Sequence, residues 1–291
     1  AELARAEPRL QVHHQSPRGL VAALNHGLAK AHAPLLGRMD ADDESPPGRL
    51  DVQVAAWRAA GGPADLVLGC AVTPFVERGE VGAGMGRYCE WLNSLRSTAD
   101  HWRERLVESP LCHPTMVAPT ALIRSLGGWR EGDFPEDYDL WLRLLAAGAR
   151  LAKVPTAGYL WRDHAGRLTR LDARYANAAF ARLKCLHLAA TWLQPRGITH
   201  VQLCGAGRDA KRWCDLLAAV GVTVARVFDV HPGRIGATIR GNVPVCDHRD
   251  LSAHLRTPTL VTIGRQGGRR QLQSELAALG LVEGEDFLCL Q

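Results

Sequence analysis

Short apolar runs alternate with segments of helical periodicity along this chain of 291 residues. Runs such as 66–72, 200–204 and 259–263 have the length of buried strands, and segments with apolar residues three and four positions apart stand between such runs. This alternation predicts an α/β fold, in which helices connect parallel strands and cover the sheet. With 46% hydrophobic residues, the chain has enough apolar surface for such cores.

A break in the pattern at residues 194–197 divides the chain into two units. The sequence Gln-Pro-Arg-Gly places proline and glycine between two periodic segments, which is typical of a linker. We therefore expect a first domain over 1–193 and a second over 198–291. The second is predicted to be a small Rossmann-like parallel-sheet domain. Its expected strands are 200–204, 223–228, 243–245, 259–263 and 287–290, and its expected helices are 209–220 and 269–279.

The first unit has the same alternation but begins in the middle of it. Helices are expected at 19–31, 47–60, 85–107, 118–125, 136–147 and 173–192. Strands are expected at 10–14, 34–39, 66–72, 151–155 and 158–161. The chain opens on what looks like the end of a helix leading into 10–14.

Two acidic clusters point to chemistry. Asp40, Asp42 and Asp43 directly follow an apolar run, where carboxylates could hold a divalent ion against a diphosphate, because hard cations prefer oxygen ligands. Glu136 and Asp137 open an apolar-periodic helix, where a carboxylate could act as a general base. Each cluster alone also fits a solvated turn or a helix start. Together they predict transfer of a sugar from a nucleotide.

The motifs between these clusters carry a family resemblance. In chain order they are RGLVAALN (18–25), RMDADD (38–43), PGRL (47–50), HPT (113–115), GGW (127–129), EDYDLWLR (136–143) and RDH (162–164). The series resembles the family 2 glycosyltransferases of the GT-A fold, over residues 1 to about 170. The resemblance implies a GT-A type nucleotide-sugar transferase domain that lacks its first strands. It also implies an inverting, hexosyltransferase-like enzyme that uses Mn²⁺ or Mg²⁺ and acts on a saccharide or lipid-linked acceptor in surface polysaccharide synthesis.

The resemblance also assigns roles to residues. Asp137 corresponds to the general base, with Glu136 orienting it or the acceptor. Asp139 lies about 200° further around the helix, so we expect no catalytic role for it. The expected metal ligands are Asp42, Asp43, Asp40 and His164, and the expected donor contacts are Arg18, Asn25 and Arg162. The acceptor side is expected to comprise His113, Gly127, Gly128 and Trp129.

The second unit contains a possible nucleotide site. Gly205 and Gly207 form a glycine turn between a strand and a helix, and Asp229 ends the next strand, where a ribose-binding acid would stand. The segments 229–233 and 241–245 resemble the N-terminal domain of bacterial sugar O-acyltransferases, which binds a nucleotide sugar. A nucleotide, NAD or a purely structural role all remain open for this unit.

Charge and cysteine content limit the partners and the cellular location that we expect for this chain. The net charge is +5 without a run of five like charges, so nucleic acid is not an expected partner. Eight cysteines without a Cys-x-x-Cys pair favour reduced thiols in a cytoplasmic protein. No apolar run approaches the roughly 18 residues of a membrane span, although the basic charge allows peripheral association at the inner membrane face. A non-catalytic binding module and an NAD-dependent oxidoreductase are the alternative functions, and the oligomeric state stays open.

Overall fold

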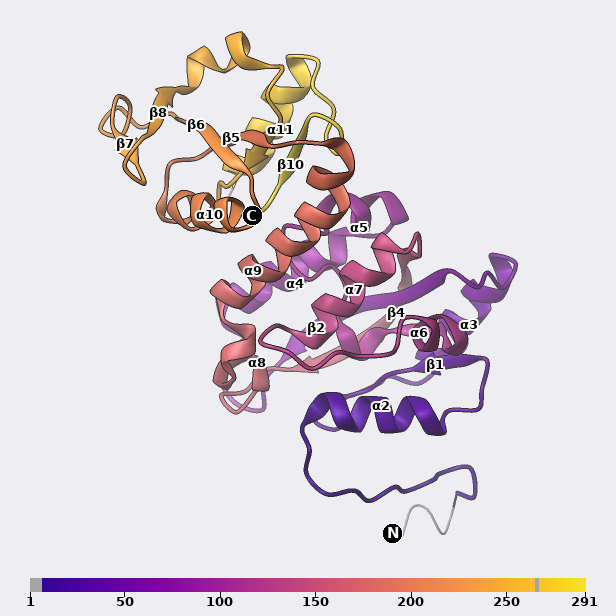
Figure 1. Cartoon of the computed structure of the whole chain (residues 1–291). Coiled ribbons are helices and arrows are strands. Elements are labelled where there is room, and N and C mark those ends of the chain that lie inside the picture. The colour runs from indigo at the N-terminus through magenta and orange to yellow at the C-terminus, as the bar shows by residue number, and fades with distance from the viewer. Residues whose placement is uncertain (1–6, 265–266) are drawn as a thin grey trace.

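The computed structural model describes residues 7–264 and 267–291, which form two sheets with helices around them (Figure 1). The first sheet has the strand order β1-β3-β2-β4, and the second has the order β10-β9-β5-β6-β8-β7. The sheets lie at opposite ends of an elongated molecule, and α9 (Asn177–Leu188) runs between them (Figure 1). The predicted α/β class is therefore confirmed.

The first sheet is built around β2 (Leu66–Phe75), which pairs in parallel with β4 (Arg150–Arg162). On the other side of β2, β3 (Val117–Pro119) pairs with it antiparallel. β1 (Leu35–Gly37) pairs antiparallel with β3 at the edge of the sheet. The first five residues of β2 are all buried, as expected for a strand that is covered on both faces. Its helices are α2 (Leu20–Lys30), α3 (Arg49–Ala59), α4 (Ala83–Ser94), α5 (Thr98–Glu104), α6 (Thr120–Ser125) and α7 (Glu136–Ala146).

The expected helix 85–107 is wrong, because the chain forms two helices there. Leu95 is extended, and Ser97 begins α5 by accepting a hydrogen bond from the Asp100 backbone N–H. The Asp100 carboxylate in turn accepts the Ser97 backbone N–H at 2.9 Å. Such a capping box satisfies the free N–H groups of a new helix and so favours a restart at this point.

Four further expectations need correction. Residues 10–14 form no strand, and the side chains of Leu10 and Val12 are about half exposed. The expected strands 151–155 and 158–161 are one strand, β4. The expected helix 173–192 is divided into η2 (Ala173–Tyr175), α9 and a π-helical end, η3 (Ala189–Leu193), and the expected helix 118–125 begins only after β3.

The second sheet confirms the Rossmann-like prediction. Strands β8 (Val243–Asp247), β6 (Thr223–Asp229), β5 (His200–Cys204), β9 (Thr259–Val261) and β10 (Phe287–Cys289) are all parallel, and only β7 (Thr238–Ile239) is antiparallel. The winding direction reverses between β5 and β9, as in doubly wound folds. The flanking helices include α10 (Arg208–Ala219) and α11 (Gly268–Ala278).

Buried contacts join the two units. The ammonium group of Lys184 in α9 donates hydrogen bonds to the carbonyl of Val107 at 2.6 Å and to that of Leu290 at 3.2 Å. A single apolar cluster contains Trp141 of the first unit together with Trp213 and Leu290 of the second. The domain boundary at 194–198 stays a prediction, because the core is continuous across it.

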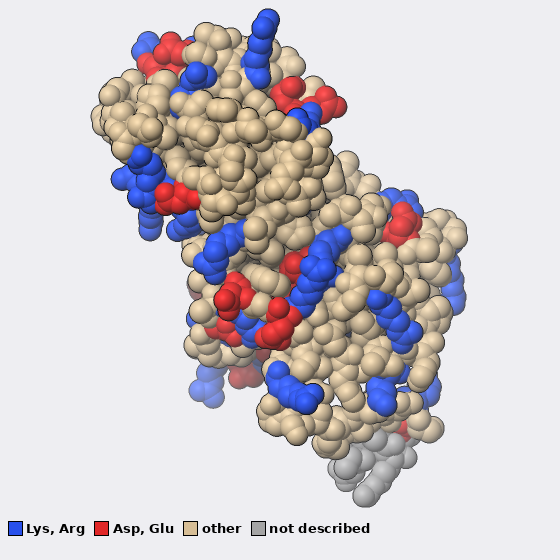
Figure 2. Space-filling view, viewed as in Figure 1, with Lys and Arg blue, Asp and Glu red and all other residues tan. Residues whose placement is uncertain are grey.

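The surface shows no concentration of one charge on the face drawn in Figure 2, where Lys and Arg side chains are interspersed with Asp and Glu. Within the described residues, none of the helices has both the length and the apolar character required to cross a bilayer.

Candidate active site

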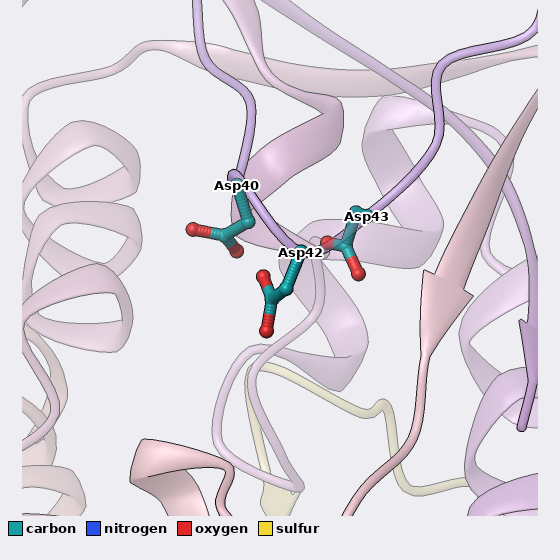
Figure 3. Close-up of side chains that lie close together, drawn as sticks. All are labelled: Asp40, Asp42 and Asp43. Atoms are coloured by element: carbon teal, nitrogen blue, oxygen red, sulfur yellow. The ribbon is translucent and has the colours of Figure 1, made fainter. Parts of the chain in front are cut away.

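An acidic turn follows β1 and contains Asp40, Asp42 and Asp43 (Figure 3). One oxygen from each of the three carboxylates lies within 4.8 Å of the other two. Backbone hydrogen bonds between Glu44 and Leu160 of β4 hold the end of the turn against the sheet. Three convergent carboxylates supply the hard oxygen ligands that Mg²⁺ and Mn²⁺ prefer, so the expected metal ligands fit such an ion.

The three carboxylates differ in their surroundings. Asp43 is buried and accepts hydrogen bonds from the Tyr159 hydroxyl at 2.9 Å and the Arg162 backbone N–H at 2.8 Å. Burial raises the pKa of Asp43. The side chain of Asp42 is 54% exposed and lies 2.9 Å from His164 Nε2, and this hydrogen bond lowers the pKa of Asp42. Asp42 is thus the most accessible of the three carboxylates, and Asp43 anchors the turn.

Arg38 and Arg162 contact the acidic turn. Arg38 donates a hydrogen bond from Nη1 to the Asp40 carboxylate at 2.6 Å. Arg162 binds the turn through its backbone N–H and through a hydrogen bond from Nε to the Asp42 carbonyl, while its guanidinium lies over the Phe75 ring. Both arginines therefore order the acidic turn. Arg38 also forms an ion pair with Asp40, whereas the ion pairs of Arg162 are with Glu44 and Glu77.

A cavity of about 600 Å³ brings the two acidic clusters together. Asp40, Asp42 and Asp43 line it from the turn after β1, and Glu136 and Asp137 line it from the first turn of α7. Other lining residues come from the segments around Glu108–His113 and around Arg167–Phe180. Two clusters that are far apart in the sequence therefore face one space.

Asp137 has the electrostatic character that a base requires. It is half-buried at the start of α7, and its carboxylate accepts the Tyr138 backbone N–H at 2.7 Å. Burial and the neighbouring Glu136 carboxylate raise the pKa of Asp137 to about 8. A general base is most effective when its pKa lies near the working pH.

Glu136 has a supporting position. Only 2% of its surface is exposed, and its carboxylate accepts a hydrogen bond from the Tyr175 hydroxyl at 2.6 Å. His113 Nδ1 lies 3.8 Å from the same carboxylate, and His113 Nε2 accepts the Trp129 indole N–H at 2.9 Å. Burial, assisted by the Arg38 charge, holds the pKa of His113 well below its usual value, so this imidazole is neutral at neutral pH.

The glycine loop before α7 is held by contacts within the protein. The indole of Trp129, an expected acceptor-side residue, is 3% exposed. Asn25, an expected donor contact, instead donates to the Trp129 carbonyl at 2.8 Å and accepts the Trp129 backbone N–H at 3.0 Å. Gly127 and Gly128 have φ values of 75° and 71°, and a Cβ on Gly128 would lie 2.3 Å from Asn25 Oδ1. These residues fix the loop behind His113.

Two other expected residues lie at the margins of the site. Arg18 is exposed before α2, whereas Leu20 lines the cavity. His164 contacts the acidic turn only through Asp42. Asp139 pairs with Arg143 at 2.7 Å, and Arg143 donates to the Gly128 carbonyl, which agrees with a structural role for Asp139.

Several residues that line the cavity were not predicted from the sequence. Arg38 stands directly before the aspartates, and this position was a usable signal. Glu108, Tyr175 and Arg170 also line the cavity, and no motif around them indicates it. Arg170 donates to both oxygens of the buried Asp163, which fixes the segment that forms this wall.

The expected nucleotide site of the second unit has its aspartate already engaged. The Asp229 carboxylate accepts the backbone N–H groups of Ala206 at 2.7 Å and His231 at 2.8 Å, and it pairs with Arg234 at 3.1 Å. Gly205 has a φ of 106°, and a Cβ there would lie 2.9 Å from Ile263, so glycine is required by the turn itself. Gly207 begins α10 with a φ of −74°. Asp229 thus closes the turn, and its assignment to a ribose stays a prediction.

In comparisons with known proteins, the family model matches within the first unit of the chain. Residues 1–119 match the family model described as Glycosyl transferase family 2. The chain is 30% identical over 138 residues to the amylovoran biosynthesis glycosyltransferase AmsE of Erwinia amylovora, covering 47% of this chain and 48% of AmsE. It is 29% identical over 126 residues to the O-antigen biosynthesis glycosyltransferase WbnJ of Escherichia coli, covering 42% of this chain and 44% of WbnJ. The chain spans about half the length of these curated relatives.

Among solved structures, a mannosyltransferase from Pyrobaculum calidifontis, in complex with GDP-Man and Mn²⁺, is similar at a TM-score of 0.40 and 17% identity. The similarity covers 76% of this chain and 54% of that protein.

Proposed function

Since residues 1–119 match the model of glycosyl transferase family 2, we propose that the chain transfers a sugar, with inversion, from a nucleotide-sugar donor to an acceptor hydroxyl. One observation carries the proposal: Asp137 and the acidic turn line the same cavity of about 600 Å³. A cavity of this volume is suited to a nucleotide-sized ligand. One wall offers carboxylates that would hold a metal ion against a diphosphate, and another offers a carboxylate that would act as the base.

The acidic turn would hold the leaving group. When bound by Asp40, Asp42 and Asp43, Mn²⁺ or Mg²⁺ would neutralise charge on the departing diphosphate. Arg162 and Arg167 also line the cavity, and their guanidinium groups would pair with phosphate oxygens. The side chain of Arg167 is 13% exposed and pairs with Asp163 at 3.5 Å, so it is held in place before a ligand arrives.

Asp137 would accept the proton of the acceptor hydroxyl. As that oxygen attacks the anomeric carbon, the bond from this carbon to the phosphate oxygen breaks and the nucleoside diphosphate leaves. Attack opposite the leaving group inverts the anomeric configuration. Glu136, fixed by Tyr175, would keep the pKa of Asp137 high through its nearby charge.

The acceptor class belongs to the same proposal. Two relatives are named for the biosynthesis of amylovoran and O-antigen. We therefore propose hexosyl transfer to a saccharide or a lipid-linked acceptor in surface polysaccharide synthesis. A cytoplasmic site, at the inner membrane face for a lipid-linked acceptor, follows from this choice.

The test compares Asp137→Asn with Asp133→Asn, a matched change at an exposed aspartate of the preceding loop. The full chain is incubated with UDP-, GDP- and dTDP-sugars, a panel of glycan acceptors and Mn²⁺, and release of the nucleoside diphosphate is measured. We expect Asp137→Asn to reduce release by about a hundredfold or more, the usual contribution of a positioned base, with donor affinity nearly unchanged. Asp133→Asn should match the parent chain.

The same assay separates the alternatives. Donor binding without release by the parent chain would indicate a non-catalytic module. Equal activity of the two variants would refute the role of Asp137.

A further inference from the structure

One part of the active-site cavity takes no part in the chemistry proposed above. It is formed by Tyr88 of α4, by Glu108 and Ser109 in the segment after α5, and by Phe180 of α9, all of which line the cavity. Glu108 belongs to neither acidic cluster, and neither the metal nor the base requires it. The role of this carboxylate follows from its neighbours.

Two contacts bring an aromatic ring to either end of the segment that carries this carboxylate. The Tyr88 hydroxyl donates a hydrogen bond to the carbonyl of Ser109 at 3.1 Å. Two residues earlier, the carbonyl of Val107 accepts a hydrogen bond from the Lys184 ammonium group at 2.6 Å. Phe180 lies one helical turn before Lys184, on the same face of α9.

Both rings are held in place by a second ring. Tyr88 stacks on Trp91 with ring centroids 5.8 Å apart, and Phe180 stacks on Tyr138 with centroids 5.3 Å apart. Each ring is therefore supported on one face by the protein, and both contribute surface to the cavity wall. Fixed aromatic surfaces of this kind suit the apolar C–H groups of a sugar ring.

The Glu108 carboxylate has free capacity to accept hydrogen bonds. It is half-buried, and its Oε1 accepts the Ser109 backbone N–H at 2.9 Å. Within the part of the chain that the structure describes, Oε2 has no hydrogen-bond or ion-pair partner. A carboxylate offers acceptor positions on both oxygens, which suits two neighbouring hydroxyl groups of a sugar.

This part of the cavity lies near the proposed base. Burial raises the pKa of the Tyr88 hydroxyl well above its usual value, and the charges of Glu108 and Asp137 raise it further. Because the interaction between charges weakens with distance, Tyr88 is close to both carboxylates. A sugar ring with one hydroxyl group at Asp137 would therefore lie within reach of Tyr88 and Glu108.

We propose that Tyr88, Glu108 and Phe180 form the subsite that recognises the sugar ring of a saccharide acceptor. Glu108 accepts hydrogen bonds from two hydroxyl groups of that ring, and Tyr88 and Phe180 pack against its C–H groups. This assignment rests on the proposed function, because it places the reacting hydroxyl group at Asp137.

The test measures binding of the methyl glycosides of glucose, galactose, mannose and N-acetylglucosamine to the full chain by saturation-transfer NMR. We expect saturable binding of at least one of the four. Glu108→Gln should weaken that binding about tenfold, because a neutral amide replaces a charged acceptor. Phe180→Leu should also weaken it, since the aromatic surface is lost. Glu90→Gln, a matched change at an exposed glutamate of α4, should have no effect.

Calorimetry with UDP-glucose and GDP-mannose in the presence of Mn²⁺ tests whether the subsite holds the donor sugar instead. Loss of glycoside binding in Glu108→Gln with unchanged donor affinity supports the acceptor subsite. A loss of donor affinity in Glu108→Gln overturns it. Equal glycoside binding by Glu108→Gln and the parent chain, or no saturable binding of any of the four glycosides, also overturns it.

The two proposals can fail separately. Glycoside binding that depends on Glu108, in a chain that releases no nucleoside diphosphate, would support the saccharide subsite and refute the proposed transfer. Circular dichroism and thermal melting without ligand establish that each variant is folded.

Discussion

The acidic turn after β1 and the glycine turn after β5 both place an aspartate beside the end of a strand, yet the two carboxylates are used differently. The side chain of Asp42 is 54% exposed and faces a cavity, whereas that of Asp229 is 5% exposed. Asp229 accepts two backbone N–H groups of its own loops. A strand-end aspartate can therefore bind a ligand only where the surrounding loop leaves its oxygens unoccupied.

The largest expected effect tests this difference through ligand binding. Asp42→Ala should weaken Mn²⁺-dependent binding of UDP or GDP by about a hundredfold, because it removes an oxygen ligand of the metal. EDTA should cause a similar loss in the parent chain. Calorimetry with and without EDTA measures both effects.

Asp229→Ala is the matched control for this experiment and should leave diphosphate binding unchanged. If the Asp229 change weakened binding as much as the Asp42 change, or if EDTA had no effect, the contrast between the two turns would be lost.

The second expected effect concerns stability, where the change at Asp229 should matter more than the change at Asp42. Asp229→Ala should lower the free energy of unfolding by about 2 kcal/mol, since it leaves backbone N–H groups in the turn without an acceptor. Asp42→Ala, at an exposed pair with His164, should change it by less than about 0.5 kcal/mol. Urea unfolding at pH 7 measures both values.

The lowered pKa of Asp229 also predicts how the stability loss in Asp229→Ala depends on pH. Although burial opposes it, hydrogen bonds from the His231 and Ala206 N–H groups hold the pKa of Asp229 below its usual value. The stability that this carboxylate provides is therefore present above the ordinary carboxyl range and is lost as the pH falls through the lowered pKa. An Asp229→Ala deficit that grew on acidification would contradict the assignment.

The last expected effect concerns Asp137 and is a pH dependence of stability. Its folded pKa is raised to about 8, so between its ordinary value near 4 and pH 8 the folded chain binds more protons than the unfolded chain. The stability of the parent chain should fall as the pH rises through this window. Asp137→Asn lacks the ionising group, so its stability relative to the parent should rise steadily as the pH is raised from 5 to 8.

Thermal or urea unfolding at both pH values measures the difference. Asp133→Asn, at an exposed position, should show no such pH-dependent gain. A constant difference between Asp137→Asn and the parent would show that Asp137 has an ordinary pKa.

Sequence periodicity predicted the elements whose burial is continuous. β2 was recognisable because residues 66–70 are all apolar or small and all buried. The break between α4 and α5 was missed because Ser97 and Asp100 lie within an otherwise helical pattern, and their capping contacts outweigh it. The strand expected at 10–14 failed because a strand requires a neighbouring strand, and Leu10 and Val12 are instead exposed.

The part of the candidate site that lies at the ends of helices and strands could be predicted from the sequence. The acidic turn and Asp137 meet because a turn after a strand and the start of α7 open toward one cavity. The roles of Asn25 and Tyr175 depend on contacts with residues 104 and 39 positions away, at Trp129 and Glu136. No local pattern records such contacts, so these residues could be assigned only from the folded structure.

Lys184 affects how this chain can change during evolution. Its buried ammonium group has acceptors in both units, at Val107 and Leu290. Replacing the second unit with an unrelated one would remove the Leu290 carbonyl and the apolar surface around Trp213, leaving a buried charge with a single acceptor. The linker offers a point at which the chain could recombine, but the apolar core is shared by both units and does not divide there. Exchange of this unit therefore requires compensating changes in α9, and the two units are expected to be inherited together.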